Sequence, residues 1–374
     1  MTKCDFLVIG AGMAGASAAF ELAGACRVIV LEREEAPGYH STGRSAAMFL
    51  ETYGNAIIRD LTVASRLFFA DPPVGFSESP LWAPRGTLTI ARADQRHTLR
   101  EAVTQARCHV PAIEEVDGAE ARRLNPVLRS DYVAAATFDA EARELDVHAI
   151  HGGYLRGLTG RGGEVVTDAE VTALTRNAGA WTAETPVGVF TAPVVVNAAG
   201  AWCDEVARLA NVAPVGLVAK RRTAITFDGP DGVDVTKWPM VIDVDEEFYF
   251  RPEGGRLLAS PADATPVPPS DVQPEEFDVA VAVERVEAAT ELSVRRIAHK
   301  WAGLRSFVAD DTPVVGMDEE ADGFFWLAGQ GGYGIMTSPS MARAAAGLIT
   351  EDTLPADLAE RGLEAADLAP GRLR

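Results

Sequence analysis

The sequence predicts an α/β protein, α+β overall, in which a domain of parallel strands and helices is joined to a second domain built on an antiparallel sheet. Two observations indicate this. Apolar runs lead directly into glycine-rich turns at residues 6–15, 194–202 and 324–334, and continuous apolar runs are typical of buried parallel strands. Residues 221–258 carry short segments that alternate between apolar and polar side chains, as antiparallel strands do.

The length supports two domains, because 374 residues are more than one ordinary core accommodates. We expect the first domain to be assembled from three segments of the chain, with the second inserted between them. The expected boundaries are 1–80, 140–215 and 300–374 for the first domain and 81–139 and 216–299 for the second.

The first glycine-rich turn has the context of a Rossmann-like dinucleotide site. The apolar strand at residues 6–9 is followed by Gly10, Gly12 and Gly15, then by an alanine-rich helix and a second apolar strand that ends at Glu32. Gly10 permits a tight turn, Gly12 lets the backbone approach a pyrophosphate, and Gly15 lets the helix pack closely. A carboxylate about 20 residues downstream can accept hydrogen bonds from a ribose diol. The pattern therefore predicts a dinucleotide bound at the start of the helix.

Apolar periodicity and glycine or proline breaks place the remaining elements. Helices are expected at residues 55–70, 98–106, 145–158, 278–298 and 338–349. Strands are expected at residues 88–90, 164–166, 171–174, 194–197, 223–227, 240–242, 248–250, 257–258 and 324–328. Residues 266–274 are expected to form a proline-rich loop, and the end after Leu354 to be disordered.

Composition excludes several classes of function. A net charge of −20 argues against nucleic acid, whose phosphates call for a basic surface, and against anionic lipid. No apolar run approaches the roughly 20 residues that span a bilayer. The four cysteines and six histidines lack the spacing of a metal site, so no metal is expected. We expect a cytoplasmic protein that is a monomer or a small homo-oligomer.

Four further segments carry a resemblance to a known family: residues 38–47, 196–204, 301–310 and 330–335. With the glycine fingerprint, they make the chain similar over essentially its whole length to the FAD-dependent D-amino acid oxidase and dehydrogenase superfamily. It is most similar to bacterial D-arginine dehydrogenase. The resemblance implies an amino acid substrate and hydride transfer to FAD, which yields a 2-oxo acid and ammonia. The electron acceptor is left open between oxygen, a quinone and another carrier.

The resemblance also implies which residues hold the cofactor. These are Gly10, Gly12, Met13, Ala14, Gly15, Glu32, Arg33, His40, Ser41, Thr42, Gly43, Arg44, Ser45, Ala46, Ala47, Val171, Ala199, Gly200, Trp202, Gly303, Arg305, Gly331, Gly332, Tyr333, Gly334 and Ile335. His40 and Ser45 also suit an ordinary loop, and Trp202 suits simple packing. No cysteine follows Cys203, so FAD is expected to be bound non-covalently.

The same resemblance assigns the reacting end of the site. Arg222 and Arg305 match positions that bind the substrate carboxylate, a task for which the planar guanidinium fork is suited. Tyr249 matches a tyrosine that assists at the carboxylate, Tyr53 a tyrosine over the substrate, and the Gly332 carbonyl an acceptor for the amine.

Plainer explanations exist for these residues. Arg222 belongs to the basic run 220–222, and such runs are usually solvated. Tyr53 and Tyr249 suit core aromatic positions with exposed hydroxyls equally well. Arg305 lies between apolar Leu304 and Phe307, where a charge is costly unless it is paired.

The substrate pocket departs from the D-arginine enzymes. Thr87 stands where an acid pairs with the guanidinium, Met48 where a histidine is expected, and Leu50 and Met336 replace a threonine and a glutamine. The rest of the pocket is assigned to Met240, Ile242 and Ile335.

The changes predict a preference for neutral, apolar D-amino acids and reduced activity on D-arginine and D-lysine. Glu51 is an alternative cation site if it turns inward. Oxidation of a secondary amine or imino acid, such as sarcosine or proline, is the alternative activity, and 2-hydroxy-acid oxidation a third. A flavoprotein that serves as a redox partner or as a subunit of a larger dehydrogenase is the non-enzymatic alternative.

Overall fold

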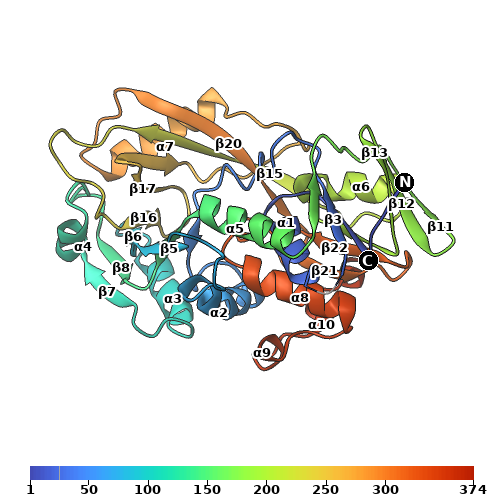
Figure 1. Ribbon diagram of the computed structural model, residues 1–374. Coiled ribbons are helices and arrows are strands. Elements are labelled where there is room, and N and C mark those ends of the chain that lie inside the picture. Colours follow the sequence, from blue (N-terminus) through green and yellow to red (C-terminus); the bar gives the residue numbers. More distant parts are fainter. Residues whose placement is uncertain (25) are drawn as a thin grey trace.

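The computed structural model describes residues 1–24 and 26–374. Its central feature is a six-stranded sheet that gathers strands from the start, middle and end of the chain (Figure 1). In spatial order the strands are β10 (Glu164–Val166), β3 (Val28–Leu31), β2 (Phe6–Ile9), β14 (Val194–Asn197), β22 (Phe324–Ala328) and β21 (Val314–Met317). All neighbouring pairs are parallel except β21 with β22.

Helices cover one face of this sheet and a small sheet covers the other. The helices are α1 (Met13–Leu22), α5 (Val147–Gly160) and α8 (Ser338–Thr350), with α2 (Ala56–Ala70) against α8. Small residues on α1, such as Ala18 and Ala19, let it pack directly on Val8 and Phe325. The opposite face packs on α6 (Cys203–Leu209) and on the sheet β1 (Thr2–Lys3), β13 (Gly188–Ala192), β12 (Ala180–Thr185) and β11 (Ala173–Asn177).

The second large sheet has nine strands. Its path is β19 (Thr265–Pro266), β15 (Val218–Phe227), β18 (Arg256–Ser260), β17 (Tyr249–Glu253), β16 (Met240–Asp243), β6 (Thr87–Ala91), β8 (Ala135–Asp139) and β7 (Glu114–Asp117), and β20 (Ile297–Phe307) also pairs with β15. Helix α7 (Glu276–Ala289) packs on its apolar face around Phe250 and Leu257, both fully buried. Helices α3 (Arg96–Ala106) and α4 (Gly118–Leu124) flank β6, β7 and β8. The other face is turned toward the six-stranded sheet.

Smaller elements complete the fold. They are the sheet β4 (Met48–Phe49), β9 (Arg143–Leu145) and β5 (Trp82–Pro84), the short helices α9 (Ala356–Ala359) and α10 (Ala365–Leu368), and the 3-10 turns η1 (Gly200–Trp202) and η2 (Pro370–Leu373). Within the described residues, no helix is both long and apolar enough to cross a membrane.

The predicted fold class is confirmed, but three local predictions were wrong. The helix expected at 278–298 ends at Ala289, and the long strand β20 begins at Ile297. The apolar spacing continues past the helix because Leu292 and Val294 still pack against the same core. Strand β20 also crosses the boundary expected at residue 300. Its pairing with β15 extends from Val218 with Phe307 to Phe227 with Ile297.

Two corrections concern shorter segments. The strand expected at 171–174 begins only at Ala173, because the chain at Val171 turns past the cavity described below. The residues after Leu354 are folded rather than disordered, since Leu358 and Leu368 are fully buried against the helical layer. The low hydrophobicity of this end concealed those two anchors.

Candidate functional site

A cavity of about 800 Å³ lies between the carboxyl ends of β2, β3, β14 and β22 and the inner face of the nine-stranded sheet. Ligands of open α/β sheets bind at this edge of the strands. Every site residue predicted from the sequence lines the cavity except Gly15 and Gly43. The structure therefore brings together segments that are as much as 320 residues apart along the sequence, from residues 10–15 to 330–335.

The two exceptions are packed glycines. A Cβ on Gly15 would lie 1.9 Å from the carbonyl oxygen of Gly10, so the helix touches the turn backbone to backbone. A Cβ on Gly43 would lie 2.8 Å from the carbonyl oxygen of Gly38, and the amide of Gly43 donates to that same oxygen at 2.7 Å. Gly10 has a φ of +101°, and a Cβ there would meet the Ala198 carbonyl at 2.6 Å. These glycines therefore allow close backbone packing around the cavity instead of lining it with side chains.

The start of α1 opens onto the cavity at Gly12, Met13 and Ala14. The helix has no side-chain cap from Gly12 and no acidic residue in its first turn. The amide of Met13 donates to Thr42 Oγ1 at 2.9 Å. A helix start that has no side-chain cap and no acidic residue in its first turn is a site for an anion such as a pyrophosphate. The residues present thus fit the phosphates of a dinucleotide.

Two side chains hold the turn from opposite sides. Glu32 accepts from the Ala11 amide through Oε2 at 2.8 Å and from the Glu34 amide through Oε1 at 3.0 Å. His151, on α5, contacts the Ala11 carbonyl through Nε2 at 2.8 Å. Burial lowers the pKa of His151, so the ring is held neutral. His151 was not predicted, and no sequence pattern linked it to the fingerprint.

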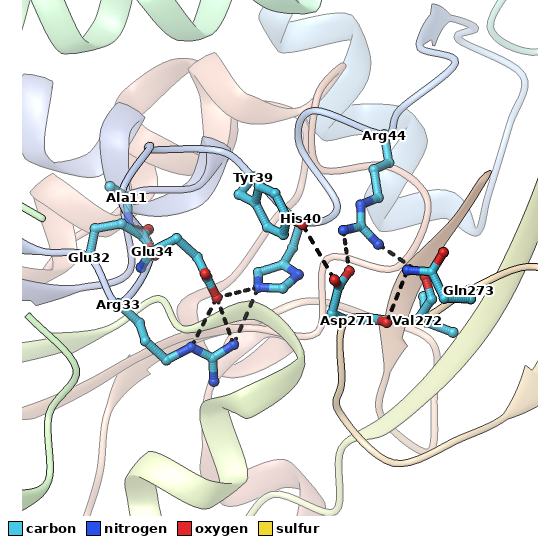
Figure 2. Close-up of polar contacts among 10 residues, drawn as sticks. All are labelled: Ala11, Glu32, Arg33, Glu34, Tyr39, His40, Arg44, Asp271, Val272 and Gln273. Carbon is cyan, nitrogen blue, oxygen red and sulfur yellow. Dashed lines mark hydrogen bonds and ion pairs between the residues drawn. The ribbon is translucent and has the colours of Figure 1, made fainter. Parts of the chain in front are cut away.

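A cluster of charged side chains lies beside Glu32, the carboxylate predicted to bind a ribose, as Figure 2 shows. The Glu34 carboxylate accepts from Arg33 at 3.0 Å and contacts His40 Nε2 at 2.8 Å. The Arg33 guanidinium lies 4.4 Å from the centre of the Trp202 ring, and the His40 ring lies 4.6 Å from it. The hydrogen bond from His40 holds the pKa of Glu34 below its usual range. Glu34 was also missed by the sequence analysis, although it follows Glu32 by two residues.

Arg44 ties the 38–47 segment to the second domain. Its guanidinium donates to the backbone carbonyls of Val272 and Ala302, both at 3.1 Å, and forms an ion pair with Asp271 (Figure 2). The Trp301 indole donates to the Arg44 carbonyl at 3.0 Å. The described contacts of Arg44 are therefore with protein groups of the proline-rich loop and β20.

The end of the cavity assigned to the substrate contains two arginines. Arg222 on β15 and Arg305 on β20 lie on the same face of two paired strands. Arg222 donates to the Asp263 carbonyl at 2.7 Å, and Arg305 donates to the Tyr53 hydroxyl at 3.4 Å. Within the described part of the chain, neither guanidinium forms an ion pair with a carboxylate. Burial and the charge of Arg305 both lower the pKa of Arg222. An anion between the two would relieve this repulsion.

Aromatic and backbone groups enclose the two arginines. The Tyr53 and Tyr333 rings meet edge to face at 5.0 Å, and Tyr249 is 9% exposed. Burial raises the pKa of Tyr333, so its hydroxyl remains protonated. A Cβ on Gly332 would lie 2.9 Å from the Arg305 guanidinium carbon, so the glycine-loop backbone is in direct contact with that side chain.

Part of the cavity wall is apolar. Met48, Leu50, Met240 and Tyr249 form one buried cluster with Leu258, and Ile242 packs against it. Ile335 and Met336 belong to a neighbouring cluster with Met13 and Phe49. The alternative in which Glu51 turns inward to bind a cation is wrong for this structure. Glu51 is 6% exposed, lies outside the cavity lining and pairs with Arg66, which donates from Nε at 2.8 Å.

One acid within the cavity was not predicted from the sequence. Asp139, at the end of β8, is 8% exposed and lines the wall directly opposite Thr87 of β6. Nothing in the local sequence marks it, because its position depends on the register of two strands that are far apart in the sequence, with Thr87 opposite Asp139 and Thr89 opposite Thr137.

Known proteins with related sequences include two mitochondrial dehydrogenases. Sarcosine dehydrogenase from Mus musculus mitochondria is 25% identical over 359 residues, which cover 90% of this chain and 38% of that protein. Dimethylglycine dehydrogenase from Rattus norvegicus mitochondria is 24% identical over 386 residues, covering 96% of this chain and 44% of that protein. The chain thus spans about two fifths of the length of these curated relatives.

Solved structures share the fold. L-proline dehydrogenase from P. horikoshii and glycine oxidase from Geobacillus kaustophilus each superpose with a TM-score of 0.85 at 20% identity, over 99% of this chain and 98% of theirs. These matches do not single out the D-arginine enzymes. The family described as "DAO: FAD dependent oxidoreductase" matches residues 5–348. Because that match extends over nearly the whole chain, this protein belongs to the DAO family of FAD-dependent oxidoreductases.

Proposed function

We propose that this protein oxidises a small α-amino acid whose nitrogen is secondary or tertiary, of the sarcosine, dimethylglycine or proline type. The observation that carries the proposal is the pair Arg222 and Arg305, which line the cavity from paired strands and lack a carboxylate partner among the described residues. Two guanidinium groups beside a partly apolar cavity wall suit the carboxylate of an amino acid. FAD, when bound, accepts the hydride that leaves the carbon beside the nitrogen.

The protein's own groups bind and orient the substrate. The Arg305 guanidinium, in contact with Tyr53, would fix the carboxylate. The backbone at Gly332, which touches Arg305, would offer its carbonyl to the N–H that a neutral secondary amine keeps, whereas a tertiary amine would be held by its carboxylate alone. The ammonium proton must pass to solvent before the C–H bond breaks. The product is an imine from a secondary amine or an iminium ion from a tertiary amine, and water can hydrolyse either. Because these contacts hold the substrate in one orientation, its C–H bond would be kept in line for hydride transfer.

Two lines of support favour a substituted nitrogen over a primary amine. The relatives and solved structures named above include enzymes of sarcosine, dimethylglycine and L-proline. The wall formed by Met48, Leu50 and Met240 offers apolar contact to a methyl group or ring carbon on the nitrogen.

The described cysteines are all free, and none lines the cavity, which suits non-covalent FAD.

The test is anaerobic mixing of the purified holoprotein with single substrates, followed by the visible absorbance of the flavin. The panel contains sarcosine, dimethylglycine and both enantiomers of proline, with D-alanine, D-methionine and D-lactate as comparisons. Bleaching that is fastest with the N-substituted amino acids supports the proposal. Bleaching by D-lactate but by no amine would overturn it.

A neutral D-amino acid is the second candidate. The observation in its favour is that Thr87, Met48 and Leu50 line the pocket while Glu51 is held by Arg66. An apolar side chain would then occupy the wall that an N-substituent occupies in the first proposal. Faster bleaching by D-methionine than by sarcosine or either proline enantiomer would favour this candidate. The arginine pair serves both.

A further inference from the structure

The wall of the cavity formed by β6 and β8 is polar, unlike the wall around Met48. Thr87 and Thr89 of β6 pair in register with Asp139 and Thr137 of β8, and all four line the cavity. Residues two apart on a strand, and partners across strands, project to the same face. The four side chains therefore form one polar surface, which meets the apolar wall at Met240, the register partner of Thr87 on the other side.

Asp139 on this surface is a buried carboxylate without a cation. One of its oxygens, Oδ1, accepts from the Glu141 amide at 2.8 Å, which closes the turn between β8 and β9. The backbone of Ala142 also acts on the carboxylate, and the charges with the largest influence on it, Glu51 and Glu141, are both acidic. Those two acids have arginine partners, whereas Asp139 forms no ion pair within the described residues. Burial, with these two acids, raises the pKa of Asp139.

Thr87 adds a second unsatisfied group. Its side chain is 6% exposed, and Oγ1 has no hydrogen-bond partner although it lies buried on the cavity wall. A buried hydroxyl without a partner and a buried carboxylate without a cation are each costly. Both costs are removed by one ligand group that donates hydrogen bonds and carries positive charge.

We propose that Asp139 and Thr87 form a subsite that binds an ammonium group carried by the substrate at the end opposite its α-carboxylate. The preferred substrate would then be longer than sarcosine or dimethylglycine and would carry a second, cationic nitrogen. This inference rests on the proposed function only for the carboxylate clamp at Arg222 and Arg305.

The test uses ligands that cannot be oxidised at an α-amine. The holoprotein is titrated with 4-aminobutanoate, 5-aminopentanoate and 6-aminohexanoate, and with the matching carboxylates that lack the amine. Binding is followed by the perturbation of the flavin absorbance. At the best-fitting length we expect the amine to tighten binding on the order of 10- to 100-fold, the range for a charged hydrogen bond.

Substitutions locate the effect. Asp139→Asn keeps the acceptor for the Glu141 amide and removes the charge, so the advantage of the amine should be lost. Glu141→Gln removes a charge two residues away, on an exposed side chain outside the cavity lining, and should keep that advantage. Thr87→Val removes the hydroxyl at similar volume and should reduce the advantage in part, which provides a second test if Asp139→Asn does not fold.

Three results would overturn the subsite. One is an amine that gives no advantage at any length in the wild-type protein. Another is an advantage that survives in Asp139→Asn. The third is a loss in Asp139→Asn that is equal for the aminocarboxylates and the plain carboxylates. If no amine bleaches the flavin but 5-aminopentanoate still binds through Asp139, the proposed function fails and the subsite stands.

Discussion

The two ends of the cavity differ in how their charges are satisfied. At the nucleotide end, Glu32 uses both oxygens on backbone amides, and Glu34 is paired with Arg33 and His40. At the substrate end, Arg222 and Arg305 line the cavity without a carboxylate partner among the described residues. The charges of the first end are paired within the chain, whereas those of the second are left for a ligand to neutralise. We therefore expect substrate specificity to depend on groups that the fold itself leaves unsatisfied.

Adjacent residues on β15 show the same contrast at close range. Arg221 is 5% exposed and pairs with Asp278 at 2.8 Å, with Asp263 at 3.7 Å and with Glu275. Arg222 points to the opposite face of the strand and contacts only the Asp263 carbonyl among these groups. The expectation that the basic run 220–222 would be solvated was thus wrong for Arg221. One arginine stabilises the fold, and its neighbour faces the cavity.

The largest effect is expected at the preorganised end, for Gly15→Ala. The added methyl would overlap the Gly10 carbonyl at 1.9 Å and push α1 away from the turn. We expect a loss of roughly 3 kcal/mol or more in unfolding free energy, with failure to retain FAD. The measurements are flavin content after purification and the unfolding midpoint.

Gly160→Ala is the matched control, because a Cβ at that helical position meets nothing within 4 Å. It should change the unfolding free energy by less than about 1 kcal/mol. Equal flavin content in Gly15→Ala and Gly160→Ala would show that the close approach of helix and turn is dispensable.

The next effect is expected at the unsatisfied end, for Arg305→Met. Loss of the guanidinium proposed to bind the substrate carboxylate should lower kcat/KM, calculated per bound FAD, by about 100- to 1,000-fold. Arg305→Lys should recover part of the loss, since it restores the charge but not the planar fork. An Arg305→Met protein with wild-type kcat/KM for amino acids would remove this residue from the carboxylate clamp.

The sequence was informative where function depends on local backbone geometry. The roles of Gly10 and Gly15 follow from a turn of six residues, and the structure has the predicted close packing at Gly15. The site-residue assignments of Arg222 and Arg305 came from family resemblance, because one belongs to a basic run and the other to an apolar stretch.

Asp139 and His151 were beyond reach for a physical reason. Asp139 enters the cavity through the register of β6 with β8, and His151 reaches Ala11 across 140 residues. Pairing at such distances is decided by the packing of whole elements and leaves no mark on neighbouring residues. The same holds for Glu51, whose partner Arg66 lies on the next helix.

A smaller effect separates the two neighbouring arginines. Arg221→Met leaves Asp278 buried without its cation and should cost about 3 kcal/mol in unfolding free energy. Arg222→Met should leave the unfolding free energy unchanged or raise it, since burial and Arg305 already disfavour its charge. Denaturant titration of the two variants without substrate checks this. Equal destabilisation by both changes would mean that Arg222 is also part of a structural ion pair.

The smallest effect concerns the pH response of the nucleotide end. Burial lowers the pKa of His151 below its ordinary value of 6.5, so the folded protein holds the ring neutral where the unfolded chain takes up a proton. The unfolded state therefore binds more protons as pH falls below 6.5, and stability should fall with it until the folded pKa is passed. The slope that one histidine can contribute is at most about 1.4 kcal/mol per pH unit.

His151→Gln can still donate to the Ala11 carbonyl and does not titrate. Its unfolding free energy should therefore decline less than that of the wild-type protein between pH 7 and pH 5, a range set by the ordinary histidine pKa. Because other groups titrate in both proteins, the difference between the two stability curves isolates His151, and parallel curves would mean that its burial carries no pH-dependent cost.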